Sequence, residues 1–132
     1  MSTDFLMDNF CFACGAKNTN GLRLQIIESG DGVKALIKMP SWAQGYHKIV
    51  HGGIVATILD ELAVWAAFKK GYKAVTVGLN VRIKNAMNID DDYVAQARVI
   101  DVKHGLVKAL SEIKTTDHRL IAHAEVKLMK SQ

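Results

Sequence analysis

The chain of 132 residues lacks the features that mark secreted, membrane-spanning or multidomain proteins. It has one proline, Pro40, and no Pro- or Gly-rich linker, so we expect a single domain over residues 1–132. Its first residues show no basic region followed by an apolar run, which argues against a signal peptide. The longest apolar stretch, residues 54–68, is interrupted by two acidic residues, which favours a buried helix over a membrane span. We therefore expect a cytoplasmic protein with no membrane partner.

Cysteine is also scarce. Cys11 and Cys14 form a single Cys-x-x-Cys motif, whereas a structural zinc site usually takes four ligands. There is no second pair, although His47 and His51 are available to complete a site. A redox role is disfavoured because the motif does not open a helix in a thioredoxin-like unit. We expect reduced structural thiols and no metal.

The remaining composition is that of an ordinary globular protein, with 49% hydrophobic and 23% charged residues. The net charge of +4 indicates either a solvated basic surface or attraction to an anionic small molecule such as a phosphate-bearing coenzyme. Nucleic acid is a weak candidate partner, because the lysines are scattered and no set of exposed aromatic residues for base stacking is evident.

Hydrophobic periodicity predicts one helix among several strands. Residues 1–20 read as an irregular lead-in, Gly30 to Gly32 as a hairpin turn, and residues 41–50 as a loop. The helical pattern covers residues 52–70 and stops at Gly71. Alternating patterns predict strands over residues 22–26, 33–39, 75–84, 93–102, 106–115 and 120–129. A helix that is apolar nearly all round must be wrapped, so we expect an α+β fold with a curved antiparallel sheet around one long central helix.

The start of the predicted helix and two acidic residues within it carry the candidate chemistry. Gly52 and Gly53 allow a ligand to approach the free N–H groups of the first turn, although the pair can simply form a tight loop-to-helix turn. Asp60 lies among apolar neighbours, where a carboxylate is costly unless it is paired. A structural ion pair is the alternative reading. Glu61 points roughly 100° away and is expected to be structural or to face a partner.

The spacing of these residues predicts an assembly. Asp60 shares a helix face with small residues that leave space for a ligand or a second subunit: Ala56, Thr57, Ala63, Val64 and Ala67. Gly52 and Asp60 are separated by ~12 Å along the helix axis, too far to act on one carbonyl carbon from the same chain. If both act on one substrate, they come from different protomers of at least a dimer.

The order of elements and the motif His-Gly-Gly-Ile-Val-Ala-Thr-Ile-Leu-Asp-Glu (residues 51–61) resemble the hot-dog-fold thioesterase superfamily, nearest its phenylacetate-degradation (PaaI-like) branch. The opening Cys-Phe-Ala-Cys-Gly with Gly-Leu-Arg-Leu, and Val-Gly-Leu-Asn-Val-Arg-Ile (residues 77–83), are similar to segments of those proteins. The resemblance covers essentially the whole chain. It implies metal-free hydrolysis of acyl-coenzyme A (acyl-CoA), with no cofactor beyond the coenzyme A of the substrate, in homodimers or dimers of dimers.

The resemblance also implies residue roles. The backbone N–H of Gly52 matches the group that polarises the thioester carbonyl, and Asp60 matches the nucleophile or general base. Thr76 matches a position near the attacking water, and His51 a histidine that orders the loop or is simply structural. Gln44 stands near an Asn or Gln of many relatives, and Arg82 and Lys84 are candidates for holding the coenzyme A phosphates. The full set of candidate substrate-binding residues is Gln44, Gly53, Glu61, Arg82 and Lys84. Asn85-Ala86 departs from the small residue plus proline common there.

Two other functions fit the same pattern. The first is a hydratase or dehydratase acting on acyl thioesters, although those relatives usually place a histidine against an acid and this helix offers only His51. The second is a non-catalytic acyl-CoA-binding protein, which has no need of a buried carboxylate. The sequence does not name the acyl group, and it leaves open both nucleophilic versus general-base catalysis and dimer versus tetramer.

Overall fold

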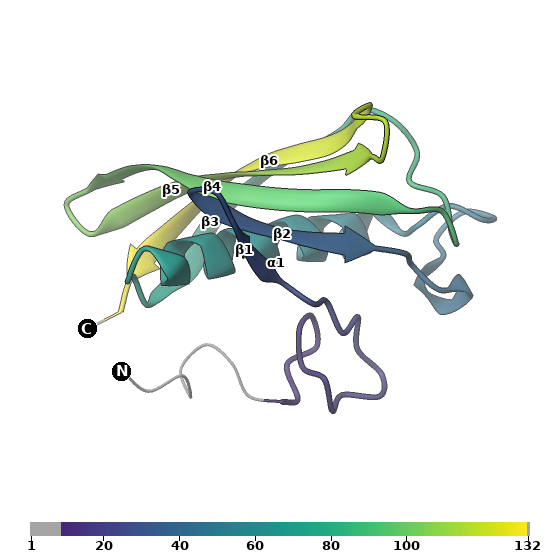
Figure 1. Cartoon of the computed structure of the whole chain (residues 1–132), viewed down its shortest axis with the longest axis horizontal. Helices are drawn as coiled ribbons and strands as arrows, with labels where there is room; N and C mark the ends of the chain where they lie inside the picture. The colour runs from purple at the N-terminus through teal and green to yellow at the C-terminus, as the bar shows by residue number, and fades with distance from the viewer. Residues whose placement is uncertain (1–8, 132) are drawn as a thin grey trace.

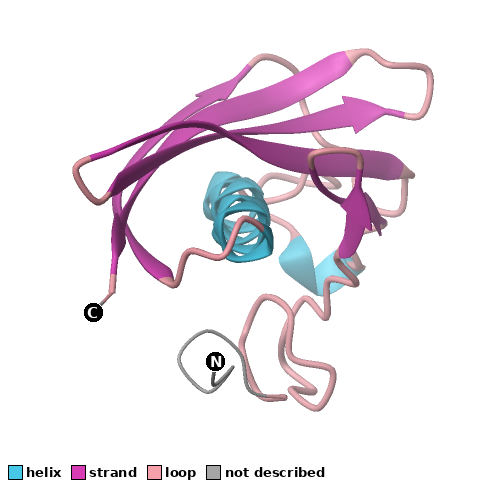
Figure 2. Cartoon of the chain, turned by 60° about the vertical axis from the view of Figure 1, so that its left-hand side comes forward, coloured by secondary structure: helices cyan, strands magenta, loops and turns pink. Residues whose placement is uncertain are grey.

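A six-stranded antiparallel sheet curves around one long helix in the computed structural model, which describes residues 9–131 (Figures 1 and 2). The strands lie in the order β1-β2-β4-β5-β6-β3. The elements are β1 (Ile27–Ser29), β2 (Gly32–Ile37), the 3-10 turn η1 (Ser41–Ala43), α1 (Gly52–Lys69), β3 (Ala74–Ile83), β4 (Tyr93–Lys103), β5 (Leu106–Thr115) and β6 (Leu120–Lys130). This architecture confirms the predicted α+β fold with a sheet wrapped around a central helix.

The first predicted strand is wrong. Residues 22–26 alternate in burial as a strand would, but β1 begins only at Ile27. Arg23 has a φ of 53°, which breaks the extended conformation. The N–H groups of Leu22 and Leu24 donate instead to the carbonyls of Phe12 and Ala13 in the lead-in. The alternation therefore reflects loop-on-loop packing rather than a sheet ladder.

The helix buries one side against the concave face of the sheet. Its fully buried positions are Val55, Ile58, Leu59, Leu62, Ala63, Ala66 and Ala67. Ala63 and Ala67 were expected to share a ligand or subunit face with Asp60. They belong instead to the core of the single chain, so that expectation is wrong for these two residues. Small residues here let the sheet approach closely, and the buried Ser111 of β5 donates a 2.7 Å hydrogen bond to the carbonyl of Leu59.

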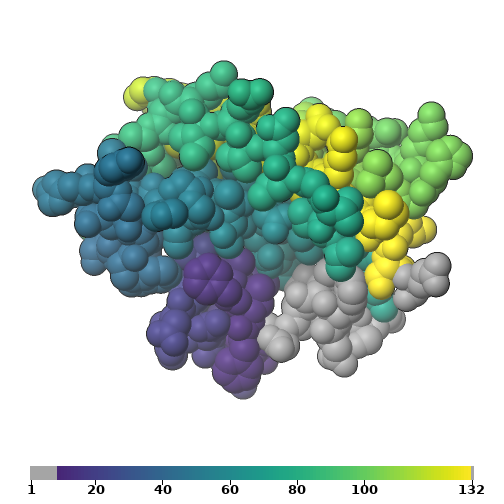
Figure 3. All heavy atoms as spheres, turned by 180° about the vertical axis from the view of Figure 1, so that it is seen from behind, coloured from purple at the N-terminus to yellow at the C-terminus, as the bar shows by residue number. Residues whose placement is uncertain are grey.

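The described part of the lead-in, residues 9–20, packs against the side of the helix that faces away from the sheet. Figure 2 shows the helix nearly end-on, with the sheet on one side and the lead-in loops on the other. In the space-filling view from behind, the purple lead-in lies directly beneath the teal part of the chain (Figure 3). The sheet therefore covers one side of the helix, and the lead-in covers part of the other. Among residues 9–131, no helix is long and apolar enough to cross a membrane.

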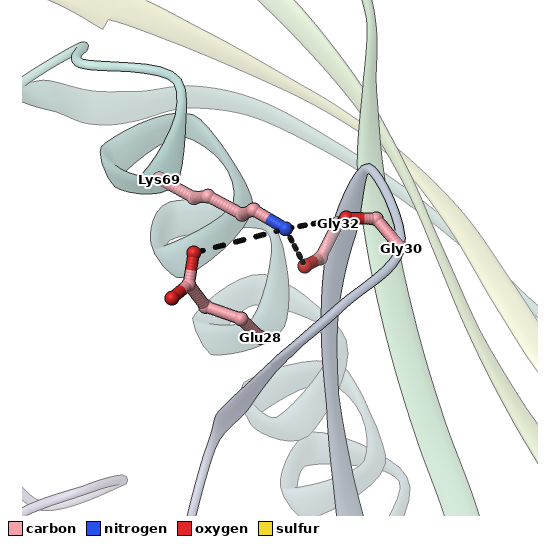
Figure 4. A network of polar contacts seen from close by, with 4 residues as sticks. All are labelled: Glu28, Gly30, Gly32 and Lys69. Atoms are coloured by element: carbon pink, nitrogen blue, oxygen red, sulfur yellow. Dashed lines mark hydrogen bonds and ion pairs between the residues drawn. The ribbon is translucent and has the colours of Figure 1, made fainter.

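Lys69, the last residue of α1, ties the helix to the β1–β2 hairpin (Figure 4). Its Nζ donates to the carbonyl oxygens of Gly30 at 2.6 Å and Gly32 at 3.0 Å, and lies 3.8 Å from a carboxylate oxygen of Glu28. The ammonium group caps two carbonyls of a turn in which Gly30 takes a φ of 57°. The Lys69 side chain is only 19% exposed, whereas that of Glu28 is 79% exposed, so the hydrogen bonds to the two carbonyls carry more of this contact than the ion pair does.

Replacing this lysine should loosen the hairpin. We expect Lys69→Met to lower the free energy of unfolding by ~1–3 kcal/mol, because hydrogen bonds from a charged donor are lost while the aliphatic stem is kept. Urea denaturation followed by circular dichroism measures the change. Lys70→Met, at the exposed neighbouring position, is the matched control, with an expected change within ~0.5 kcal/mol. Equal effects of the two variants would contradict the assignment.

Candidate active site

The loop before α1 positions the start of the helix. Its ends are held together by an isolated antiparallel bridge between Gln44 and Val50, and the N–H of His51 donates to the carbonyl of Ala43. Lys48 has a φ of 61°, and its N–H donates a 2.8 Å hydrogen bond to the Oε1 of Gln44. These backbone bonds make the chain enter the helix from a fixed direction.

His51 is the N-cap of the helix. Its Nδ1 accepts a 2.9 Å hydrogen bond from the N–H of Gly53, and its carbonyl accepts from Ile54 and Val55. An Nδ1 that accepts a hydrogen bond carries no proton, so this cap uses the tautomer with the ring N–H on Nε2. The predicted loop-ordering role of His51 therefore has a concrete geometry, which is that of a helix cap.

Capping leaves one donor of the first turn open. The Gly53 N–H goes to His51, whereas within residues 9–131 the N–H of Gly52 donates to no acceptor. Gly52 is exposed, and a Cβ built on it would meet only the Cδ1 of Ile83, at 3.6 Å. An unpaired N–H at a helix N-terminus is suited to bind a polarised carbonyl oxygen, because the helix dipole adds to the hydrogen bond.

Two hollows flank this donor. One, of about 490 Å³, is lined by Gly45, Tyr46, Val50, His51 and Gly52. The other, of about 320 Å³, is lined by Trp42, Ala43, Gln44, His51, Gly53, Ile54 and Thr57. Gln44 thus borders a hollow beside the helix start, although its amide oxygen is already engaged by Lys48. Tyr46, 86% exposed, and Trp42, 53% exposed, were not predicted as site residues, because the sequence does not show which aromatic residues of a loop point outward.

Asp60 lies midway along the same helix and is paired with Thr76 of β3. The Oγ1 of Thr76 donates a 2.6 Å hydrogen bond to the Oδ1 of Asp60. In the single chain Asp60 is half-buried rather than enclosed as expected, because it faces the open edge of the sheet at β3. The carboxylate is thus oriented by a hydroxyl yet still accessible, as a nucleophile or general base must be.

The strand β3 forms an exposed edge of the sheet and carries a bulge. Its pairing with β6 shifts between Thr76 and Gly78, so the residues on either side of Val77 do not follow one alternation. The simple alternation predicted for residues 75–84 would put Thr76, Asn80 and Arg82 on one face, and the bulge shows this to be wrong. Thr76 pairs with the buried Leu128 and faces the helix, whereas the partners of Asn80 and Arg82 are Glu125 and His123 on the outer face.

The structure brings some predicted residues together and separates others. Gly52, Gly53, His51 and Gln44 gather at the helix start, while Asp60 and Thr76 form a second group ~12 Å along the axis. Arg82 and Lys84, both exposed, flank Ile83 at the end of β3 nearest Gly52. The remaining candidate, Glu61, belongs to neither group.

Glu61 instead contacts the lead-in. Its Oε2 accepts from the Nε1 of Trp65 at 3.2 Å and lies 3.7 Å from the Sγ of Cys11. Both contacts are made within the single chain, so of the two expectations for Glu61, structural or facing a partner, they fit the structural one. No sequence signal links residues 11 and 61, because the contact depends on how the lead-in folds over the helix.

Comparison with known proteins then decides the family. The model of the Thioesterase superfamily matches residues 47–122, which include the end of the loop, the helix, three strands and the start of β6. The chain belongs to the thioesterase superfamily. No curated protein matches this sequence.

Solved structures confirm the hot-dog fold of this superfamily. A crystal structure of a thioesterase superfamily protein is similar with a TM-score of 0.87 at 19% identity, over 93% of this chain; the chain spans only 61% of that protein. The Escherichia coli PaaI protein from the phenylacetic acid degradation operon has a TM-score of 0.76 at 19% identity, over 83% of this chain and 84% of that one.

A third similar structure contains a ligand. It is a hypothetical thioesterase protein from Streptococcus pneumoniae with coenzyme A, with a TM-score of 0.75 at 18% identity, over 81% of this chain and 84% of that one. Two further structures of that protein carry an alanine in place of one aspartate and of one threonine. At these identities the likeness establishes the fold.

Proposed function

We propose that this thioesterase superfamily protein is a cytoplasmic acyl-CoA thioesterase of the PaaI-like branch that hydrolyses a thioester to a free acid and coenzyme A. The observation that carries the proposal is the Asp60 carboxylate, oriented by Thr76 and left accessible at the sheet edge. Its chemistry needs no metal and no cofactor, because a carboxylate and a backbone donor suffice to activate water and polarise a carbonyl.

The solved relatives support this assignment. Thr76 follows Asp60 by 16 positions in the sequence, and the replaced threonine of the S. pneumoniae protein follows the replaced aspartate by the same separation. The choice of these two residues for substitution fits the idea that the pair is functional in that protein. The coenzyme A in another structure of the same protein supports the substrate class.

The reaction is assigned to residues as follows. The carbonyl oxygen of the thioester accepts a hydrogen bond from the free N–H of Gly52, which stabilises the negative charge that develops on it. Asp60 either attacks the carbonyl carbon, forming a mixed anhydride that water then hydrolyses to the free acid, or takes a proton from the water that attacks the carbonyl carbon. Because the hydroxyl of Thr76 donates its hydrogen bond to Asp60, its oxygen lone pairs are free to accept a hydrogen bond from that water. Coenzyme A leaves as the thiolate and is protonated by solvent.

Gly52 and Asp60 are ~12 Å apart on one helix, so a shared site needs Gly52 of one protomer and Asp60 of another. A dimer formed through β3 meets this requirement. Four side chains of this edge strand are 42–58% exposed although they are apolar: Val75, Val77, Leu79 and Ile83. An exposed apolar edge is a natural pairing surface. Antiparallel pairing of β3 with its copy about a two-fold axis at Asn80, with Val77 as the extra residue of the bulge, places Thr76 of one protomer opposite Ile83 of the other. Since Ile83 adjoins Gly52, each Asp60 then approaches the partner's helix start.

Such a homodimer, alone or doubled into a dimer of dimers, builds two identical sites between protomers. Arg82 and Lys84 flank Ile83 at the mouth of each site and are the candidates for holding the phosphates of coenzyme A. The hollows around Tyr46 and Trp42 beside the helix start offer room for the substrate.

Release of free thiol from a panel of aromatic and aliphatic acyl-CoA substrates tests the proposal. We expect catalytic release of coenzyme A from at least one of them, and the best substrate identifies the acyl group. Consumption of an unsaturated acyl-CoA without thiol release would indicate a hydratase, and binding without any turnover would indicate a binding protein. Either result would contradict the proposed function.

A further inference from the structure

Two cysteines and a glutamate meet where the lead-in crosses the helix. The Sγ atoms of Cys11 and Cys14 and a carboxylate oxygen of Glu61 lie within 4.8 Å of one another, and all three residues are half-buried. The Sγ of Cys11 lies 3.7 Å from the Oε2 of Glu61. This cluster lies outside the proposed active site and has no role in its chemistry.

We propose that Cys11, Cys14 and Glu61 bind a Zn²⁺ ion that fastens the lead-in to the central helix. Two thiolates and a carboxylate are a ligand set that zinc accepts, with Zn–S bonds of about 2.3 Å and Zn–O bonds of about 2.0–2.2 Å. Ligand atoms around one such ion lie ~3.5–4 Å apart, which the cluster nearly satisfies before any adjustment. A water molecule completes the tetrahedron on the half-exposed side.

The surroundings hold these ligands in place. The Nε1–H of Trp65 donates to the Glu61 carboxylate at 3.2 Å, as outer groups commonly do for metal ligands. The two cysteines sit in a closed turn, in which the N–H of Gly15 donates to the carbonyl of Cys11 at 2.9 Å. A Cβ on Gly15 would come within 2.4 Å of the Cys11 nitrogen, so this tight turn requires glycine.

Electrostatics favours a cation at this point. Burial, and then the nearby Glu61 carboxylate and Cys11, raise the pKa of Cys14 well above that of a free thiol. Ionised thiols beside a carboxylate repel one another, so the charged form is stable only with a cation among them. Zinc binding therefore releases thiol protons, and its affinity should rise with pH. Without metal, neutral thiols and the carboxylate form only weak S–H hydrogen bonds.

Metal titration of the full-length protein tests the proposal. The protein is stripped with a chelator under a phosphine reductant and titrated with Zn²⁺ against a chromophoric chelator, and in parallel with Co²⁺. We expect one ion per chain, thiolate-to-cobalt charge-transfer absorption in the near ultraviolet, and a higher melting temperature with Zn²⁺. Cys14→Ser should abolish the thiolate-dependent binding. Trp65→Phe, which removes only the outer donor, should weaken it by ~10–100-fold.

Glu125→Gln, at a carboxylate remote from the cluster, is the matched control and should bind Zn²⁺ as the parent does. Glu61→Gln should weaken binding by at least ~10-fold, because it removes a charged ligand. Absence of stoichiometric binding, a cobalt spectrum without thiolate absorption, or equal affinity of Glu61→Gln and Glu125→Gln would overturn the proposal. So would oxidation of both thiols to a disulfide with no metal bound. None of these readouts depends on thioesterase activity, so this proposal and the proposed function fail independently.

Discussion

Asp60→Asn should reduce kcat for thioester hydrolysis by ~10²–10⁴-fold while leaving the protein folded. Asparagine has nearly the same shape as aspartate, and its Oδ1 still accepts the 2.6 Å hydrogen bond from Thr76. It can neither take a proton from water nor attack a carbonyl carbon as a carboxylate does. Because substrate contacts at the helix start are unchanged, KM should change little, and steady-state kinetics with the best substrate of the panel measure both constants.

The control for this variant is Asp101→Asn, which removes an exposed carboxylate from β4. It should keep the parental kcat, and circular dichroism of both variants should match that of the parent. If Asp60→Asn hydrolyses acyl-CoA at the parental rate, Asp60 is neither nucleophile nor general base and the mechanism is wrong.

Gly52→Pro should lower kcat by ~10²–10³-fold without unfolding the helix, because it deletes the N–H assigned to the thioester carbonyl. Gly52 is the first helical residue, a position where proline is favoured. The preceding His51 has a ψ of 135°, which is compatible with a following proline. The only neighbour of an added Cβ is Ile83, at an ordinary contact distance of 3.6 Å.

Gly52→Ala separates the lost donor from the added bulk. It adds the same Cβ but keeps the N–H, so we expect it to lose no more than ~10-fold in kcat, far less than the proline variant. Thermal unfolding checks that both variants retain the parental stability. Similar losses for alanine and proline would show that the space at Gly52, rather than its N–H, supports turnover.

Most of the fold could be predicted from the sequence because its signals are local. The helical period from Gly52 onward, the glycine stop at Gly71 with a φ of 92°, and the His104–Gly105 turn each depend on a few adjacent residues. The strand expected at residues 22–26 failed because the lead-in packs on itself. Burial of every second residue is the same signal whether a strand or a neighbouring loop covers it.

The site could be predicted only in part. Gly52 and Asp60 stand out from the residues themselves, whereas their specific roles and that of Thr76 are implied by the resemblance to a family. If Gly52 and Asp60 act on one substrate, their spacing on one helix requires two protomers. The bulge at Val77, which turns Thr76 toward Asp60, has no pattern that the sequence displays. The cluster of Cys11 with Glu61 joins residues 50 positions apart, so no motif spacing could reveal it.

The most direct test of the account is activity in mixed dimers of Asp60→Asn and Gly52→Pro, each inactive alone. In a mixed dimer, Gly52 of the Asp60→Asn chain meets Asp60 of the Gly52→Pro chain, so one of the two sites is intact. Random reassociation at equal concentrations makes half the dimers mixed and should restore about a quarter of the parental rate. If mixed dimers form, as native mass spectrometry of differently tagged chains would show, but no activity returns, the site is not shared between protomers.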